Sequence, residues 1–145
     1  MRRFVVLVVV VLLAAGCTGG SGGLPTATTK DFADLDLVAS HARDWASGLG
    51  DPNPKQVLIV RTPVWRYWGQ EPSTDPERNR EIYGVLVEGD FVGCRDLGCS
   101  QPPGGTNPHT QWLTFVWDPS QHVTTDAAQS WADLTAMGKV FRVEL

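Results

Sequence analysis

Apolar residues recur every three or four positions between residues 32 and 49, which is the spacing of one face of an α-helix. The stripe consists of Phe32, Leu35, Val38, Ala42, Trp45 and Leu49. Thr28 is followed three positions later by Asp31, a pattern typical of a helix N-terminal cap. Gly48 or Gly50, followed by prolines, ends the pattern. The sequence therefore predicts an amphipathic helix that packs through its apolar face.

Beyond residue 54 the apolar residues occur in short β-branched or alternating runs, which predict strands at 55–62, 81–93, 111–117, 122–125 and 139–145. Residues 64–68 are predicted to continue the first strand after a proline bend, and Gly89 is a candidate bulge. Exposed loops are predicted at 69–80 and 94–110, and a short helix near Leu134. Because the strands follow one another by turns, we expect a two-layer α+β domain. Its N-terminal helix would pack on a four- to five-stranded, mainly antiparallel sheet.

The first 16 residues have the organisation of a secretory signal peptide. Arg2 and Arg3 precede an apolar run, Phe4–Gly16, that is shorter than the roughly 20 residues of a spanning helix. At its end, Leu13-Ala14-Ala15-Gly16-Cys17 resembles the lipobox of bacterial lipoproteins, in which small residues precede a cysteine. The resemblance implies cleavage before Cys17 and a diacylglyceryl group on its sulfur. The alternative is an ordinary signal peptide with an incidental cysteine.

The segment after Cys17, TGGSGGLPTATT, is rich in glycine and small polar residues and predicts a flexible tether. We therefore expect a signal peptide at 1–16, a lipidated cysteine and tether at 17–29, and a single α+β domain at 30–145. Such a domain would be held on the outer face of the bacterial cytoplasmic membrane, in the cell envelope.

The other two cysteines, Cys94 and Cys99, lie in the predicted long loop. Export places them in an oxidising compartment, where an even number of thiols is expected to pair, so we predict a disulfide. The alternative is a metal site that also uses His109 and His122. Because the spacing fits no standard zinc pattern, we expect no metal and no other cofactor.

The charge balance limits the classes of partner. The chain carries 12 basic and 16 acidic residues, a net charge of −4, and loss of Arg2 and Arg3 leaves 10 against 16, or −6. No cluster of lysine or arginine occurs along the sequence. This argues against nucleic acid, whose binding depends on phosphate neutralisation, and against electrostatic membrane contact beyond the anchor.

Catalytic motifs are nearly absent: the sequence holds no S-x-x-K, H-E-x-x-H or P-loop pattern, and its G-x-S-x-G match, at residues 19–23, falls within the glycine-rich segment after Cys17. His109 lies in the proline- and glycine-rich loop, and His122 begins a predicted strand. A Ser-His-Asp arrangement can be assembled from Ser120, His122 and Asp118. The same residues are also typical of an ordinary turn.

The chain has six tryptophans, and Trp65-Arg66-Tyr67-Trp68 places aromatic side chains on both faces of one predicted segment. One face can enter the core, while the other can stay open for a partner. Alternatively, Trp68 folds under the loop that follows. We expect a candidate binding surface that combines this segment with the long loop. Its residues are Trp65, Tyr67, Trp68, Pro102, Pro103 and His109.

From the sequence we expect a membrane-anchored cell-envelope lipoprotein that acts as a non-catalytic binding or accessory module. Its partners would be the lipid bilayer, through Cys17, and an envelope protein, peptide or glycan. One alternative is a small extracytoplasmic enzyme of the hydrolase type that uses His109 or His122, and another is a structural envelope protein. A buried polar pocket near either histidine would favour chemistry, whereas a flat aromatic patch would favour binding.

Overall fold

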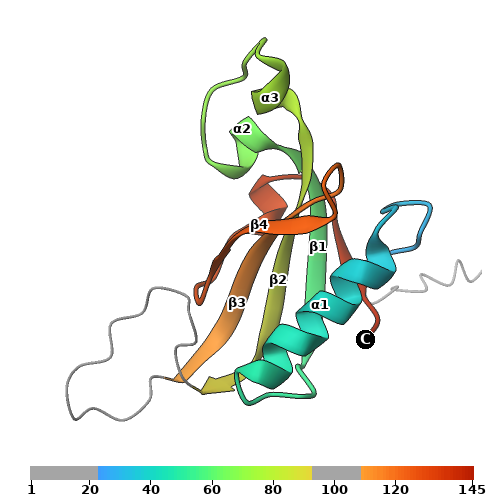
Figure 1. Ribbon diagram of the computed structural model, residues 1–145, viewed down its shortest axis with the longest axis vertical. Helices are drawn as coiled ribbons and strands as arrows, with labels where there is room; N and C mark the ends of the chain where they lie inside the picture. Colours follow the sequence, from blue (N-terminus) through green and yellow to red (C-terminus); the bar gives the residue numbers. More distant parts are fainter. Residues whose placement is uncertain (1–22, 93–108) are drawn as a thin grey trace, which may run out of the picture.

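The structure is a computed structural model that describes residues 23–92 and 109–145. Its elements, in chain order, are α1 (Leu35–Gly48), β1 (Gln56–Pro63), α2 (Val64–Tyr67), α3 (Pro76–Asn79), β2 (Glu81–Val92), β3 (His109–Asp118), β4 (Val123–Ala128), the 3₁₀ turn η1 (Leu134–Ala136) and β5 (Val140–Val143). The strands form one sheet in the order β4-β3-β2-β1-β5 (Figure 1). Each strand pairs antiparallel with its neighbours. The predicted α+β class with a five-stranded antiparallel sheet is confirmed.

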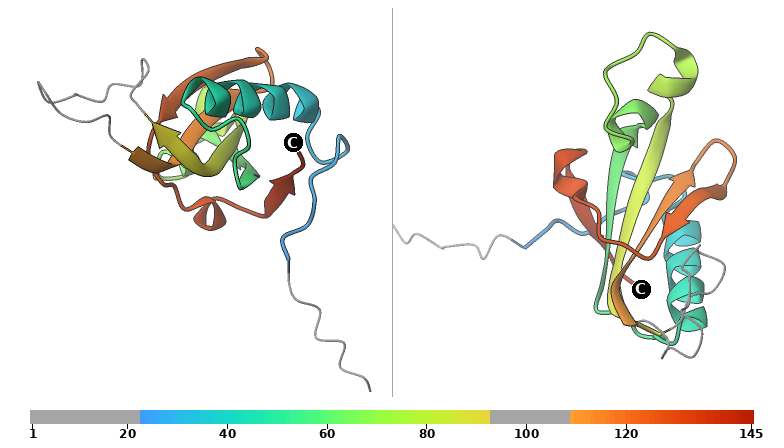
Figure 2. Two further views of the ribbon diagram at one scale, coloured as in Figure 1. Left: turned by 90° about the horizontal axis from the view of Figure 1, so that it is seen from below. Right: turned by 90° about the vertical axis from the view of Figure 1, so that its left-hand side faces the viewer.

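One face of the sheet forms the main core together with α1. Val38, Ala42 and Ala46 of α1 are fully buried, and the two alanines bring the helix backbone close to the sheet. Alternate residues of the strands complete the same cluster: Val57, Ile59, Val85, Val87, Leu113 and Phe115. Figure 2 shows α1 on one side of the sheet and the β4–β5 connection, with η1, on the other. None of the helices in the described residues is both long and apolar enough to cross a bilayer.

The start of α1 differs from the prediction. The backbone N–H and hydroxyl of Thr28 donate to Asp31 Oδ2 at 3.0 and 2.6 Å, so the predicted capping pair exists. It closes a separate turn, however, and α1 begins only at Leu35 with Asp34 in the N-cap position. The prediction that Thr28 caps the helix is therefore wrong, and the intervening turn brings Phe32 into the core.

The predicted strand continuation at residues 64–68 is also wrong, because these residues form the single turn α2. Gly69 closes the turn with a φ of +64°, a left-handed conformation that glycine adopts without strain. The ring of Tyr67 packs over Gly84 of β2, where a Cβ would lie 3.1 Å from the ring. Because Gly84 has no side chain, the ring of Tyr67 can pack directly on β2, and residues 64–68 fold back over the sheet.

The bulge predicted at Gly89 is confirmed by a register shift of β2 against β3 between Glu88 and Phe91. A Cβ at Gly89 would lie 2.5 Å from Asp51 Oδ2 and 2.7 Å from the ring of Phe91. Asp51 Oδ2 accepts a hydrogen bond from the backbone N–H of Asp90 at 2.8 Å. Glycine is therefore required here by the close approach of the loop after α1.

Candidate functional site

The predicted aromatic surface lies on and beside α2, at one end of the sheet (Figure 1). Trp68 is 51% exposed and meets the ring of Tyr67 edge-on, with 5.0 Å between the centroids. The guanidinium of Arg66 lies 4.9 Å from the ring centre of Trp65. Burial raises the pKa of Tyr67 to about 12, so its hydroxyl stays protonated at neutral pH.

His109 begins β3 at the opposite end of the sheet from α2, so the structure does not bring it next to the aromatic residues (Figure 1). The 12 residues of β2 separate the two ends. At about 3.3 Å per residue they span roughly 40 Å. His109 Nδ1 lies 3.3 Å from Asp90 Oδ1, and both side chains are exposed. The other predicted site residues, Cys17, Cys94, Cys99, Pro102 and Pro103, lie outside the described residues.

His122 is held by Asp34 rather than by Asp118. It follows the β3–β4 turn with a φ of +54°, and its Nδ1 lies 2.8 Å from Asp34 Oδ2. The indole N–H of Trp117 donates to the same oxygen at 2.9 Å. Asp34 is only 8% exposed, and the Trp117 hydrogen bond, followed by His122, lowers the pKa of its carboxyl. This cluster fastens the start of α1 to the β3–β4 hairpin.

The Ser-His-Asp arrangement considered from the sequence is not assembled. The hydroxyl and the backbone N–H of Ser120 both donate to Asp118 Oδ1, at 2.6 and 2.9 Å. The other oxygen of Asp118, a fully buried residue, pairs with Arg80 Nη1. Ser120 therefore stabilises a turn, because its hydroxyl bonds to the carboxylate and not to the imidazole of His122.

The third histidine, His41, joins α1 to β4. Its Nε2 lies 2.8 Å from the hydroxyl of Thr124, and its ring centre lies 4.8 Å from that of Trp45. Burial lowers the pKa of His41, which favours the neutral ring. In the part of the chain that the structure describes, no group of three or more His, Cys, Asp or Glu side chains can hold a metal ion.

We expect the Asp34 cluster to make stability depend on pH in the acid range. The pKa of Asp34 is lowered from its ordinary value of 3.8, so its stabilising contribution is fully present above that pH. The contribution is lost as the pH falls through the lowered folded-state value. Urea unfolding of the Asp34→Asn variant should show a weaker loss of stability between pH 5 and pH 3 than the wild type. Asp36→Asn, at an exposed position of α1, should keep the wild-type dependence.

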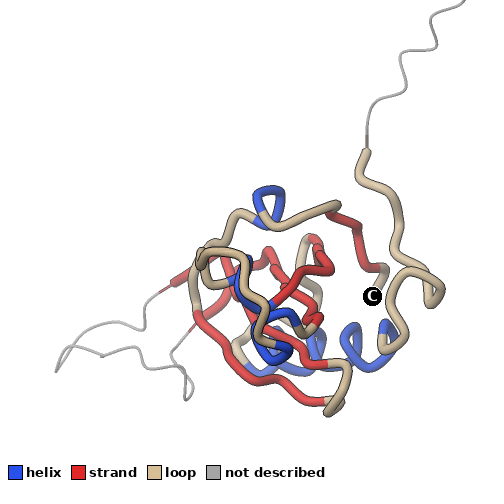
Figure 3. Tube along the Cα trace, turned by 90° about the horizontal axis from the view of Figure 1, so that it is seen from above, coloured by secondary structure: helices blue, strands red, loops and turns tan. Residues whose placement is uncertain are grey.

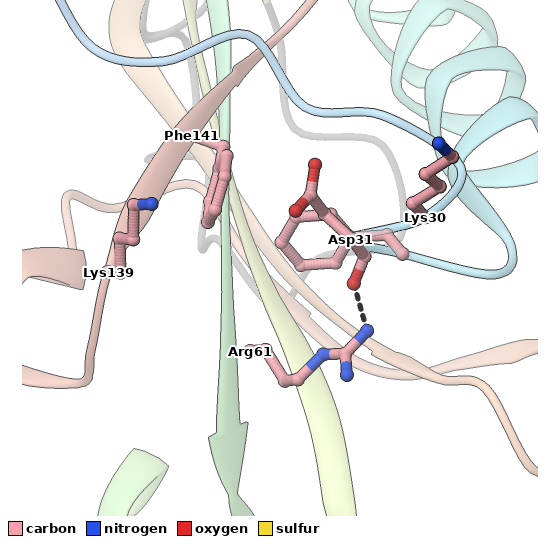
Figure 4. Close-up of a pocket in the computed structure, with 6 residues that line it drawn as sticks. Lys30, Asp31, Arg61, Lys139 and Phe141 are labelled. Carbon is pink, nitrogen blue, oxygen red and sulfur yellow. Dashed lines mark hydrogen bonds between the residues drawn. The ribbon is translucent and has the colours of Figure 1, made fainter.

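A cationic pocket, which has no signature in the sequence, lies where the turn before α1 meets β1 and β5 (Figure 4). Its volume is about 320 Å³. Six residues line it: Lys30, Asp31 and Phe32 from the turn, Arg61 from β1, Lys139 directly before β5, and Phe141 within β5. Three cations from distant parts of the sequence thus surround one hollow.

The guanidinium of Arg61 is fixed in place before any ligand arrives. Its Nε lies 3.3 Å from Glu81 Oε1, and its Nη2 donates to the backbone carbonyl of Asp31 (Figure 4). The Arg61 Cζ also lies 5.5 and 5.8 Å from the ring centres of Phe32 and Tyr83, within cation–π range. Since a guanidinium has five N–H donors, these contacts leave others for an anion.

The two lysines of the pocket have fewer contacts than Arg61, although Lys139 Nζ lies 4.8 Å from the ring centre of Phe141. Within the described residues, neither Lys30 nor Lys139 forms an ion pair with a carboxylate. Arg61 follows Val60 and Lys139 precedes Val140, and Val60 and Val140 are partners in the β1–β5 ladder, so the two cations are close neighbours at the end of that ladder. Like charges in that relation repel, and an anion between them would relieve the repulsion.

Asp31 contributes one negative charge to the pocket, but its carboxylate is already engaged. Hydrogen bonds from Thr28 lower the pKa of Asp31, so it remains ionised with one oxygen directed to Thr28. Three cationic side chains therefore stand against two carboxylates, Asp31 and the Glu81 that pairs with Arg61, in a chain whose net charge is negative. The remaining positive charge favours an anion over a cation in this pocket.

Comparison of the chain with family models, with curated proteins and with solved structures finds no match.

Proposed function

We propose that this chain is a membrane-anchored lipoprotein of the bacterial cell envelope and acts as a non-catalytic binding module. Cys17 would carry the lipid, and a two-layer domain, with α1 laid against one face of the sheet, would carry the binding site. That site is the cationic pocket, which takes an anionic group of the ligand. The aromatic residues of α2 remain a second predicted contact surface, at a different part of the sheet.

The observation that carries the proposal is the concentration of positive charge in the pocket. Two of the three lysines in the chain, Lys30 and Lys139, line it together with Arg61. Holding these positive charges close together costs electrostatic free energy, and a bound anion would offset that cost. The fixed guanidinium suits a phosphate or carboxylate, because it presents several donors in one plane.

The size of the pocket limits what it can enclose. Ligand pockets typically measure about 300–1,000 Å³, and a volume of about 320 Å³ lies at the lower end of that range. The pocket therefore suits a single anionic group and a few neighbouring atoms of the ligand. The rest of a larger ligand would lie on the surrounding surface.

Inorganic phosphate provides a direct test of this site. Phosphate should raise the free energy of unfolding relative to chloride at equal ionic strength, by about 1.4 kcal/mol at ten times its dissociation constant. Lys139→Gln should remove most of that gain. Lys55→Gln, which removes the same charge about 20 Å away along β1, should retain it. Equal phosphate stabilisation of wild type and both variants would contradict the proposal.

A further inference from the structure

We propose that the anion in the cationic pocket is the phosphate of an anionic membrane lipid, so that the domain rests against the bilayer that anchors it. This inference rests on the proposed function, both for the lipid on Cys17 and for the anion site. The phosphate chemistry is shared with soluble phosphates, and lysine footprinting on vesicles separates the two sources.

The pocket lies beside the point where the chain leads toward Cys17. The backbone N–H of Arg142 donates to the carbonyl of Pro25 at 2.8 Å, and that of Ala27 donates to the carbonyl of Arg142 at 2.7 Å. The N-terminal segment therefore runs along β5, as Figure 3 shows. The same strand supplies Phe141 to the pocket, and Lys139 directly precedes it.

The length of chain before this segment keeps the pocket near the membrane surface. Eight residue steps separate Cys17 from Pro25, the first residue hydrogen-bonded to β5. At about 3.5 Å per residue, no conformation lets them span more than roughly 30 Å. A lipid headgroup is therefore always present at high effective concentration, without a separate diffusional encounter.

The charge distribution selects the face that can meet an anionic bilayer. The chain from Cys17 onward has 10 basic and 16 acidic residues, so most of its surface is repelled by such a membrane. Lys30 and Lys139 are exposed beside the attachment segment. Membrane contact beyond the anchor was not expected from the sequence because it has no basic run, whereas the fold gathers these cations from separate segments.

Lysine footprinting of the lipidated protein, purified from envelopes and reconstituted into vesicles, tests this inference. The chain has only three lysines, and Lys55 serves as an internal control. The rates of acetylation at each lysine are compared in vesicles of phosphatidylcholine and of phosphatidylcholine with phosphatidylglycerol. We expect acetylation of Lys30 and Lys139 to slow by about fivefold on the anionic vesicles, with Lys55 unchanged. In the Lys30→Gln variant, the protection of Lys139 should decrease.

A third arm adds inorganic phosphate to the phosphatidylcholine vesicles and separates the two proposals. Protection by phosphate without protection by phosphatidylglycerol would overturn the lipid inference and leave the anion pocket standing. No protection in either arm would overturn both. Equal slowing at all three lysines on the anionic vesicles would mean general shielding by the surface, and would also overturn the inference.

Discussion

Replacing Cys17 by alanine is expected to yield a protein without acyl chains. Two chains at about 0.8 kcal/mol per buried methylene anchor a protein by something on the order of 20 kcal/mol. The pocket cations add only about 1 kcal/mol each near an anionic surface, so they cannot replace the anchor. Mass spectrometry of the N-terminal peptide, together with membrane fractionation, measures the result.

The matched control for this variant removes the other two thiols. Cys94→Ala/Cys99→Ala should keep the acyl mass and the membrane association, because of the three cysteines only Cys17 follows the small-residue run that resembles a lipobox. The lipoprotein proposal fails if the native mature chain begins at another residue and carries no acyl mass.

Asp118→Ala should lower the free energy of unfolding by about 3 kcal/mol, the cost of breaking a buried ion pair on one side. Asp118 is fully buried, and it pairs with Arg80 while holding Ser120 in the turn. The side chain of Arg80 is 30% exposed, which lets it regain some water and places the cost at the lower end of the range. Urea denaturation measures the change.

Glu77→Ala gives a comparison at the same arginine. Glu77 Oε2 lies 3.6 Å from Arg80 Nε, but the glutamate side chain is 83% exposed. Removing an exposed ion pair should cost less than about 1 kcal/mol. If Asp118→Ala costs no more than Glu77→Ala, the buried pair does not stabilise the fold.

The elements that the sequence predicted correctly are those fixed by local patterns. Residues 81–93 and 111–117 alternate or run apolar between turn residues, and they become β2 and β3. Gly89 marked its bulge because a glycine inside a strand pattern usually accompanies a bulge or a close approach of another backbone. In these segments the alternation of side chains and the flanking turn residues determine the strands, and contacts with the rest of the chain are not needed to predict them.

The errors occurred where tertiary contacts outweigh local preference. Asp34 occupies the N-cap position of α1, but its side chain makes no capping hydrogen bond. Its carboxylate instead bonds to Trp117 and His122, more than 80 residues away in the sequence. Residues 64–68 turn back because Gly84 of another strand leaves room for Tyr67. Neither contact has a signature in the neighbouring sequence.

The cationic pocket could not be predicted for the same reason. Lys30, Arg61 and Lys139 are separated by 31 and 78 positions, and only the β1–β5 pairing and the turn before α1 bring them together. A search for basic runs finds nothing at this spacing. The chain has only three lysines, and the fold, not the sequence, places two of them in one pocket.

The central claim, that this pocket binds an anionic group, is tested most directly by amide NMR spectra of the protein recorded during titration with inorganic phosphate. We expect saturable shifts concentrated at residues 30–32, at Arg61 and at residues 139–141, the segments that line the pocket. Lys55 and Arg78, exposed cations elsewhere on the domain, should not respond. Shifts that are absent from the pocket, or spread over all exposed cations without saturation, would contradict the claim.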